Sequence, residues 1–259
     1  MDNFLEKLVM DAKNTVKSGY YGVGWKAPRN SMSLTGSINS CKHAPIIAEI
    51  KPSSPSMGKL RNVENVVEVA GQIERGGAVG ISVLTEPKHF NGSLKLLTTV
   101  RQKTKLPLLM KDIIVDPVQI NAGFTAGANA VLLIYSIFEK HLTEHSLEEM
   151  IGLAHSHGLQ VILETNTREE FLNALETDAD LIGINNRDLR TLKVDLKTTE
   201  TVLAGIGDCR KIIVSESGIK TPGDIRYLRR CGARAFLVGT SIMLSENVKG
   251  KVRELVMAL

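Results

Sequence analysis

The chain has 259 residues, of which 43% are hydrophobic and 4% aromatic, and its formal net charge is +4. This length suits one large α/β domain or two small ones, and it allows a sizeable core. Basic residues spread along the chain do not indicate nucleic-acid binding, whereas a small anionic substrate is compatible with them.

The three cysteines, Cys41, Cys209 and Cys231, have no metal-ligand spacing. They indicate a reducing compartment and predict no metal site. Residues 1–13 carry too many charges for a signal peptide, and the longest apolar run, near 130–134, is too short to cross a bilayer. We therefore expect a cytoplasmic protein without a membrane span.

The first part of the chain differs from the rest. Apolar residues recur at helical spacing between 1 and 17, which predicts an amphipathic helix. Residues 18–43 form a polar stretch with Gly and Ser, which we interpret as a connection that wraps or caps another part of the protein. Residues 1–45 are thus predicted to be an N-terminal extension, and residues 46–259 the regular part of a single domain.

From residue 46 onward, short apolar runs alternate with stretches of helical pattern. The predicted strands are 46–50, 80–84, 107–111, 130–134, 160–164, 181–185, 212–215 and 235–238. Helical stretches between them include 63–75, 146–157, 168–176 and 221–230. This alternation predicts one (β/α)₈ barrel with an N-terminal helical extension. A doubly wound sheet is the alternative, but its Gly-rich fingerprint after the first strand is missing.

Polar residues occupy the carboxyl ends of several predicted strands, which meet at one end of a barrel. Alternation places five of them on the inward face: Glu49, Lys51, Lys111, Glu164 and Asn185. Each alone has a plainer explanation, as a solvated charge, an ion-pair partner or a turn former. Together they would destabilise a barrel without a function, because buried charges are costly. The set predicts acid–base chemistry on a carbonyl or an enamine.

Two late loops, 215–222 and 238–243, each place Gly beside a hydroxyl residue just before a helix. Backbone N–H groups at such positions bind phosphate, and in barrels this pair of loops commonly does so. We therefore expect a phosphorylated substrate, with Ser54 of the first loop near the same anion. Phe90 lies in a polar loop, where it either packs on an aromatic substrate or anchors the loop to the core. The six histidines receive no catalytic role.

Taken together, these segments resemble the indole-3-glycerol-phosphate synthase family. The resemblance covers nearly all of 46–259 and depends on I-I-A-E-I-K-P-S-S-P-S, S-V-L-T-E-P-K-H-F-N-G-S, L-M-K-D-I-I-V-D-P, A-V-L-L-I, L-I-G-I-N-N-R-D-L and V-S-E-S-G-I-K-T-P. It implies a lyase of tryptophan biosynthesis that closes the ring of 1-(2-carboxyphenylamino)-1-deoxyribulose 5-phosphate with loss of carbon dioxide and water. It implies no metal or organic cofactor, and we expect a monomer.

The resemblance also implies roles for individual residues. Lys111 resembles the general acid that protonates the ribulose carbonyl, and Lys51 the lysine that meets the substrate carboxylate, although the division of acid roles between them stays open. Glu164 resembles the carboxylate that moves protons during dehydration. The remaining matches are groups that orient or bind the substrate: Glu49, Asn185, Ser54, Arg187, Glu216, Ser217, Gly218, Gly239 and Thr240.

One departure from the family pattern concerns the aromatic pocket. Ile113 stands where the family usually has an aromatic residue, which predicts a looser pocket for the anthranilate ring.

Two other functions remain as alternatives. Another phosphate-binding barrel, such as phosphoribosylanthranilate isomerase, would share the late loops, but it would use a Cys and Asp pair where Glu49 and Lys51 stand here. A barrel that binds an anionic metabolite without turnover would not need inward acid–base groups.

Overall fold

The computed structural model describes residues 4–22, 24, 26–28, 31–54, 58–59, 65–189, 191–207 and 209–259, without the side chains of 54 and 59. Eight parallel strands form a closed barrel in the order β1-β10-β9-β8-β7-β6-β5-β4, with β4 pairing to β1. The barrel strands are β1 (Ile46–Ile50), β4 (Gly80–Leu84), β5 (Leu108–Lys111), β6 (Ala130–Ile134), β7 (Gln160–Thr165), β8 (Leu181–Asn185), β9 (Ile212–Glu216) and β10 (Ala235–Val238). The predicted (β/α)₈ barrel is confirmed, and each predicted strand lies within one residue of the observed bounds.

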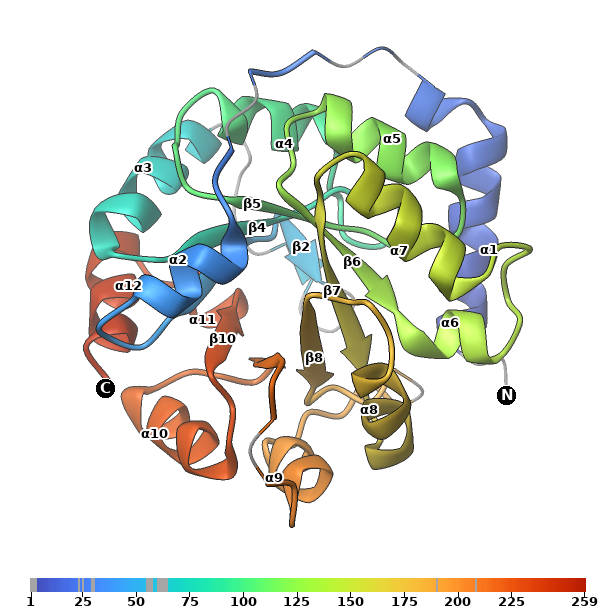
Figure 1. Ribbon diagram of the computed structural model, residues 1–259. Coiled ribbons are helices and arrows are strands. Elements are labelled where there is room, and N and C mark those ends of the chain that lie inside the picture. The colour runs from blue at the N-terminus through green and yellow to red at the C-terminus, as the bar shows by residue number, and fades with distance from the viewer. Residues whose placement is uncertain are drawn as a thin grey trace.

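Helices surround the strands (Figure 1). They are α3 (Val66–Gly76), α4 (Leu94–Arg101), α5 (Pro117–Thr125), α6 (Tyr135–Glu139), α7 (Leu147–Ser156), α8 (Arg168–Leu175), α9 (Lys197–Leu203), α10 (Pro222–Cys231), α11 (Thr240–Met243) and α12 (Val248–Val256). Helices α5, α7, α8 and α10 each begin with a capping box, in which an Asp, Ser or Thr side chain and the third helical residue exchange hydrogen bonds. These local signals fix where the helices start, and thereby the lengths of the loops before them. A two-stranded hairpin, β2 (Ser53–Ser54) with β3 (Gly58–Lys59), follows β1.

Burial on both faces explains why the strands are short, apolar runs. Every residue of β1, β4, β6, β8, β9 and β10 is buried, as expected where helices cover the outside of a parallel barrel and side chains fill the inside. The exceptions to the apolar pattern are the inward polar residues near the strand ends, among them Glu49, Glu164 and Glu216. Their position sets one end of the barrel apart from the rest of the core.

The N-terminal extension contacts both ends of the barrel. Helix α1 (Phe4–Lys17) and the short 3₁₀ helix η1 (Tyr20–Gly22) come first, and α2 (Leu34–Ser40) lies in front of the strands in Figure 1. Gln160, the first residue of β7, accepts hydrogen bonds from the backbone N–H groups of Leu34 (2.6 Å) and Thr35 (3.2 Å). Leu34 also packs against Gly80, the first residue of β4. The structure agrees with the interpretation of 18–43 as a segment that caps another part of the protein, because α2 covers the amino-terminal end of the barrel, although the helix itself was not predicted.

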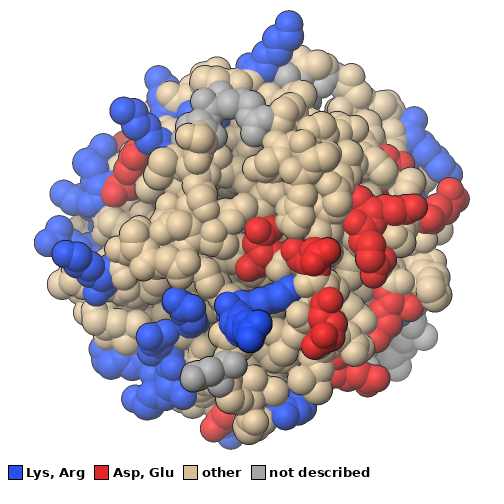
Figure 2. Space-filling view, in the orientation of Figure 1, with Lys and Arg blue, Asp and Glu red and all other residues tan. Residues whose placement is uncertain are grey.

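Charges of opposite sign lie on opposite sides of the face that carries α2. Figure 2 shows Lys and Arg mainly on its left, over α3, α10 and α12, and Asp and Glu mainly on its right, toward α7 and α8. Within the described part of the chain, no helix has the length and apolar character needed to span a bilayer.

Candidate active site

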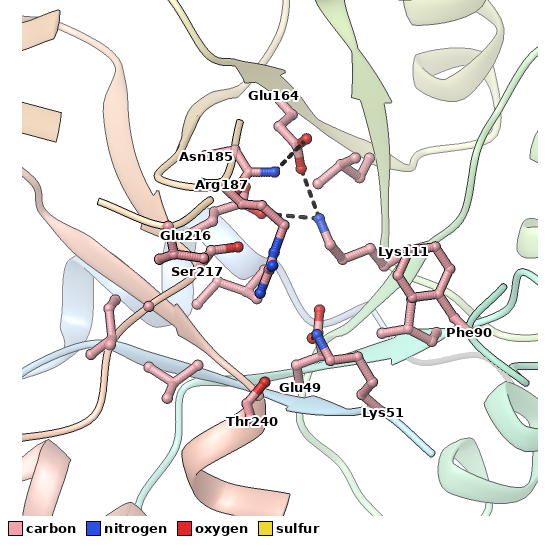
Figure 3. Close-up of a pocket in the computed structure, with 18 of the residues that line it drawn as sticks. Glu49, Lys51, Phe90, Lys111, Glu164, Asn185, Arg187, Glu216, Ser217 and Thr240 are labelled. Carbon is pink, nitrogen blue, oxygen red and sulfur yellow. Dashed lines mark hydrogen bonds and ion pairs between the residues drawn. The ribbon is translucent and has the colours of Figure 1, made fainter. Parts of the chain in front are cut away.

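One cavity of about 700 Å³ opens at the carboxyl-terminal end of the barrel. Twelve of the thirteen predicted site residues line it: Glu49, Lys51, Phe90, Lys111, Glu164, Asn185, Arg187, Glu216, Ser217, Gly218, Gly239 and Thr240. The thirteenth prediction, the side chain of Ser54, lies outside the described part of the structure. Segments far apart in the sequence therefore meet at one site, as Figure 3 shows for ten of these residues.

Lys111, at the end of β5, is the centre of the polar cluster. Its Nζ lies 2.8 Å from Oε2 of Glu164 on β7 and 3.0 Å from Oε2 of Glu216 on β9. Burial by itself lowers the pKa of Lys111, but the carboxylates of Glu164, Glu216 and Glu49 more than offset this, and the net pKa is raised. The ammonium is therefore held charged until a substrate changes its surroundings.

Glu216 is almost completely enclosed, with 1% of its surface exposed. Burial raises its pKa to about 7, although the nearby Lys111 ammonium opposes the shift. Its Oε2 faces Lys111, whereas its Oε1 is buried and has no hydrogen-bond partner among the described residues. A methyl group added at Gly183 of β8 would collide with that Oε1. The missing side chain of Gly183 thus leaves the space in which the carboxylate lies.

A second ion pair lies on β1 and the residue after it. Lys51 Nζ is 2.9 Å from Oε1 of Glu49, so the shared inward face predicted for the two residues is confirmed. Gly239 makes room for Glu49, because a Cβ at Gly239 would come within 2.5 Å of the same Oε1. In Figure 3 this pair lies across the cavity from the Lys111 cluster, with Arg187 extending between them.

Asn185 fixes the orientation of Glu164. Its Nδ2 donates to Oε1 of Glu164 (2.9 Å), and its Oδ1 accepts from the backbone N–H of Arg187 (2.9 Å). Because both ends of the amide are engaged, the second carboxylate oxygen of Glu164 faces Lys111. The Arg187 guanidinium donates to the carbonyl of Leu192 (2.8 Å), and burial lowers its pKa.

The two late loops meet at another part of the cavity. Ser217 and Gly218 both have positive φ, 68° and 84°, a conformation that Gly adopts without strain and that turns successive N–H groups toward one side. Ser241 Oγ donates to the carbonyl of Ile219 (2.9 Å) and so joins the two loops. Gly239 precedes the short helix α11, and its carbonyl accepts from the backbone N–H groups of Ile242 (3.0 Å) and Met243 (2.9 Å).

Apolar side chains complete the wall of the cavity, among them Phe90, Ile113, Leu132 and Ile134. Phe90 also packs against the core, as the second of its two predicted roles requires, and its contact with an aromatic substrate stays a prediction. Helix α1 contributes Leu8 to the same wall. Asp11 of α1 contacts the loop after β4 through Lys88 (3.2 Å) and His89 (2.8 Å). His89, which was predicted to have no catalytic role, thus helps to hold α1 over the cavity.

Several residues that line the cavity were not predicted to belong to a site. Glu86 stands just past a strand end and Lys220 lies in the loop 215–222, positions that could have placed both residues here, whereas alternation after Lys111 assigns Asp112 to the opposite face of the strand. Leu8 and Lys251 lie on helices, where helical spacing shows a buried face but not which part of the protein it meets. Such contacts depend on how the ends of the chain fold back onto the barrel.

Comparison with known proteins agrees with the geometry. The family model for indole-3-glycerol phosphate synthase matches residues 5–255. Relatives with this name include those of Methanocaldococcus jannaschii, 45% identical over 88% of this chain and 84% of the relative, and Aquifex aeolicus, 43% identical over 84% and 83%.

Solved structures with the same fold are more distant. A thiamine phosphate pyrophosphorylase from Pyrococcus furiosus has a TM-score of 0.60 at 18% identity, covering 83% of this chain and 94% of its own. An N-acetylmannosamine-6-phosphate 2-epimerase from Clostridium perfringens has a TM-score of 0.62 at 14% identity, covering 83% and 93%. At these identities the likeness concerns the barrel fold alone.

Proposed function

Because the chain belongs to the indole-3-glycerol phosphate synthase family, we propose that it catalyses the ring closure of 1-(2-carboxyphenylamino)-1-deoxyribulose 5-phosphate to indole-3-glycerol phosphate. The reaction releases carbon dioxide and water and belongs to tryptophan biosynthesis. The observation that carries the proposal is the position of Lys111, a partly buried ammonium between two carboxylates in a cavity large enough for such a substrate.

Ring closure requires an electrophilic carbonyl carbon. We assign Lys111 as the acid that gives a proton to the ribulose carbonyl oxygen while the carboxyl-bearing ring carbon forms the new carbon–carbon bond. Its contacts with Glu164 and Glu216 hold the ammonium in one place before the substrate enters, so little reorganisation is required at the moment of reaction.

The substrate carboxylate requires a cation, and Lys51 brings an ammonium to the cavity from the residue after β1. In this proposal Lys51 binds the carboxylate until carbon dioxide leaves, and Glu49 keeps Lys51 turned inward. Arg187, which lies between the two ion pairs in Figure 3, adds positive charge at the same place.

Dehydration completes the reaction. The new hydroxyl group leaves as water after it receives a proton, and a base removes a proton from the ring that has just formed. Glu164 is suited to the base because Asn185 fixes its orientation while Lys111 stays within 2.8 Å to supply or take up a proton. Oε1 of Glu216, which has no partner in the described part of the chain, can accept a hydrogen bond from a substrate hydroxyl.

The phosphate of the substrate is assigned to the late loops. Backbone N–H groups at Gly218 and at the start of α11 supply donors, Thr240 supplies a hydroxyl, and Lys220 and Lys251 bring positive charge to the wall of the same cavity. The apolar wall that contains Phe90 is left for the aromatic ring.

Indole fluorescence after addition of the ribulose substrate tests the proposal. We expect turnover by the wild type, a loss of at least about 10³-fold in kcat for Lys111→Ala, and retained binding of indole-3-glycerol phosphate by that variant. Lys95→Ala is the matched control, because Lys95 is exposed on α4, outside the cavity. A folded wild type without turnover would contradict the proposed function.

A further inference from the structure

Asp112 follows the proposed acid directly in sequence, but the contacts described above do not use it. It is buried, with 2% of its surface exposed, and it lines the cavity. Its Oδ1 accepts from the backbone N–H of Ile113 (2.8 Å), and its Oδ2 accepts from the Thr85 hydroxyl (2.5 Å). The hydroxyl of Tyr21 lies 3.1 Å from Oδ1 and 3.0 Å from Oδ2. Both carboxylate oxygens are therefore occupied, which leaves neither free to act on a substrate.

Thr85, one of the partners of Asp112, also binds the main chain of Lys111. Thr85 donates its backbone N–H to the carbonyl of Lys111 (3.0 Å) and its hydroxyl to Asp112. Thr85 thus binds two neighbouring groups, the main-chain carbonyl of Lys111 and the side chain of Asp112. Because Lys111 is the last residue of β5, these bonds hold the strand end from which the ammonium extends.

Tyr21 connects this strand end to the N-terminal extension. It belongs to η1, 91 residues before Asp112, and only 3% of its surface is exposed. Its ring packs edge-on against Tyr20, whose hydroxyl accepts from the backbone N–H of Leu94 at the start of α4 (3.1 Å). The position of Lys111 therefore depends on a segment that is distant in sequence.

Asp112 is held without a basic partner. Among the described residues, no Lys, Arg or His side chain forms an ion pair with it, and its neighbours are hydroxyl and amide donors. A buried carboxylate of this kind is costly unless its hydrogen bonds are complete, and burial raises its pKa to about 7. Such an arrangement suits a group whose role requires a fixed geometry.

We propose that Asp112 is a positioning residue, which joins Tyr21 of the N-terminal extension and Thr85 to the end of β5 and so sets the place of Lys111 in the cavity. The inference depends on the proposed function, because it concerns the acid of that reaction. Loss of the Asp112 contacts moves the proton donor without removing it, so the chemical step slows while substrate binding changes little.

The test uses the full-length chain in the indole fluorescence assay, with active sites counted by titration with indole-3-glycerol phosphate. We expect Asp112→Asn to lower kcat by about 10- to 100-fold and to change KM by less than about threefold. Tyr21→Phe, a milder change that keeps the ring, should lower kcat by about tenfold. The double variant should be no slower than Asp112→Asn, because both changes break one network.

Matched variants separate positioning from folding. Tyr20→Phe removes a hydroxyl from the adjacent ring but leaves Asp112 untouched, so its kcat should equal that of the wild type. Thr85→Ser keeps the hydroxyl and should retain kcat, whereas Thr85→Val should lower it about tenfold. A purely structural role would lower the melting temperature and leave kcat per titrated site unchanged.

Two results would overturn the inference. One is an unchanged kcat per site in Asp112→Asn and Tyr21→Phe, and the other is a loss of kcat in the double variant equal to the product of the two single losses. An inactive wild type would instead contradict the proposed function and, with it, this inference. An active wild type with unchanged variants contradicts the inference alone.

Discussion

Lys111 reaches Glu216 across the axis of the barrel. The two residues come from β5 and β9, which are four places apart in the ring of eight strands and so lie opposite each other, yet Nζ and Oε2 are 3.0 Å apart. Only a long side chain at each strand end can close this distance. The contact therefore depends on closure of the whole barrel, and it also helps to keep Lys111 charged.

Replacement of Glu216 should change the pH dependence of turnover. Glu216→Gln removes one of the negative charges that raise the pKa of Lys111, so the lysine loses its proton at lower pH. We expect the alkaline limb of the kcat profile to move to lower pH and kcat at neutral pH to fall by about 10- to 100-fold. Glu148→Gln, an exposed change on α7, is the control. An unmoved alkaline limb would show that Glu216 does not influence the proton of Lys111.

Gly183→Ala tests the same carboxylate without changing its charge. The added methyl group would occupy the position of Oε1 of Glu216 and force that side chain to turn. We expect a loss of about tenfold or more in kcat, with little change in binding of indole-3-glycerol phosphate. Gly152→Ala on α7, where a Cβ meets no atom within 4 Å, is the matched control. Wild-type kcat in Gly183→Ala would mean that the orientation of Glu216 has no part in turnover.

Ile113→Phe should tighten substrate binding. Ile113 lines the cavity, and a larger aromatic side chain there would bury more apolar area against the anthranilate ring, worth about 1 kcal/mol. The expected result is a KM lowered about fivefold with kcat within a factor of three. A raised KM would show that the pocket has no space for the larger ring. Ile114→Phe is the comparison, because Ile114 is buried but does not line the cavity.

The contribution of Asp112 and Glu216 to stability should fall as the pH rises from about 4 to about 7. Burial raises the pKa of both Asp112 and Glu216 to about 7, from ordinary values of 3.8 and 4.5. In this range these two groups bind more protons in the folded protein than in the unfolded chain, so their contribution to the free energy of unfolding decreases with increasing pH. Urea unfolding at several pH values measures the slope, and Asp112→Asn and Glu216→Gln should each make it shallower. Equal slopes in wild type and variants would contradict the raised pKa values.

The strands and their inward residues could be predicted because they depend on patterns within a few neighbouring residues. Alternation along 46–51 places Glu49 and Lys51 on one side, and the end of each apolar run marks the open end of the barrel. Eight such runs suffice for the fold. The meeting of Lys111 with Glu164 then follows from closure of the sheet and needs no further information.

Helix α2 could not be predicted, because Leu-Thr-Gly-Ser-Ile-Asn-Ser is a poor helix-forming sequence. Its stability comes from tertiary contacts, namely the bonds of Gln160 to its first turn and the burial of Leu34. Asp112 was missed for a related reason. Alternation after Lys111 turns it away from the barrel interior, and only the folded chain reveals Tyr21 and Thr85 on that side.

The contacts of the N-terminal extension also bear on the order of folding. The partner of Tyr21, Asp112, lies 91 residues later in the chain, and the partner of Leu34, Gln160, lies 126 residues later. During synthesis the extension therefore leaves the ribosome before its partners exist: Tyr21 can dock only after β5 has been made, and α2 only after β7 has begun. The segment of the chain that is made first thus completes its contacts at the two ends of the barrel at two different stages of synthesis.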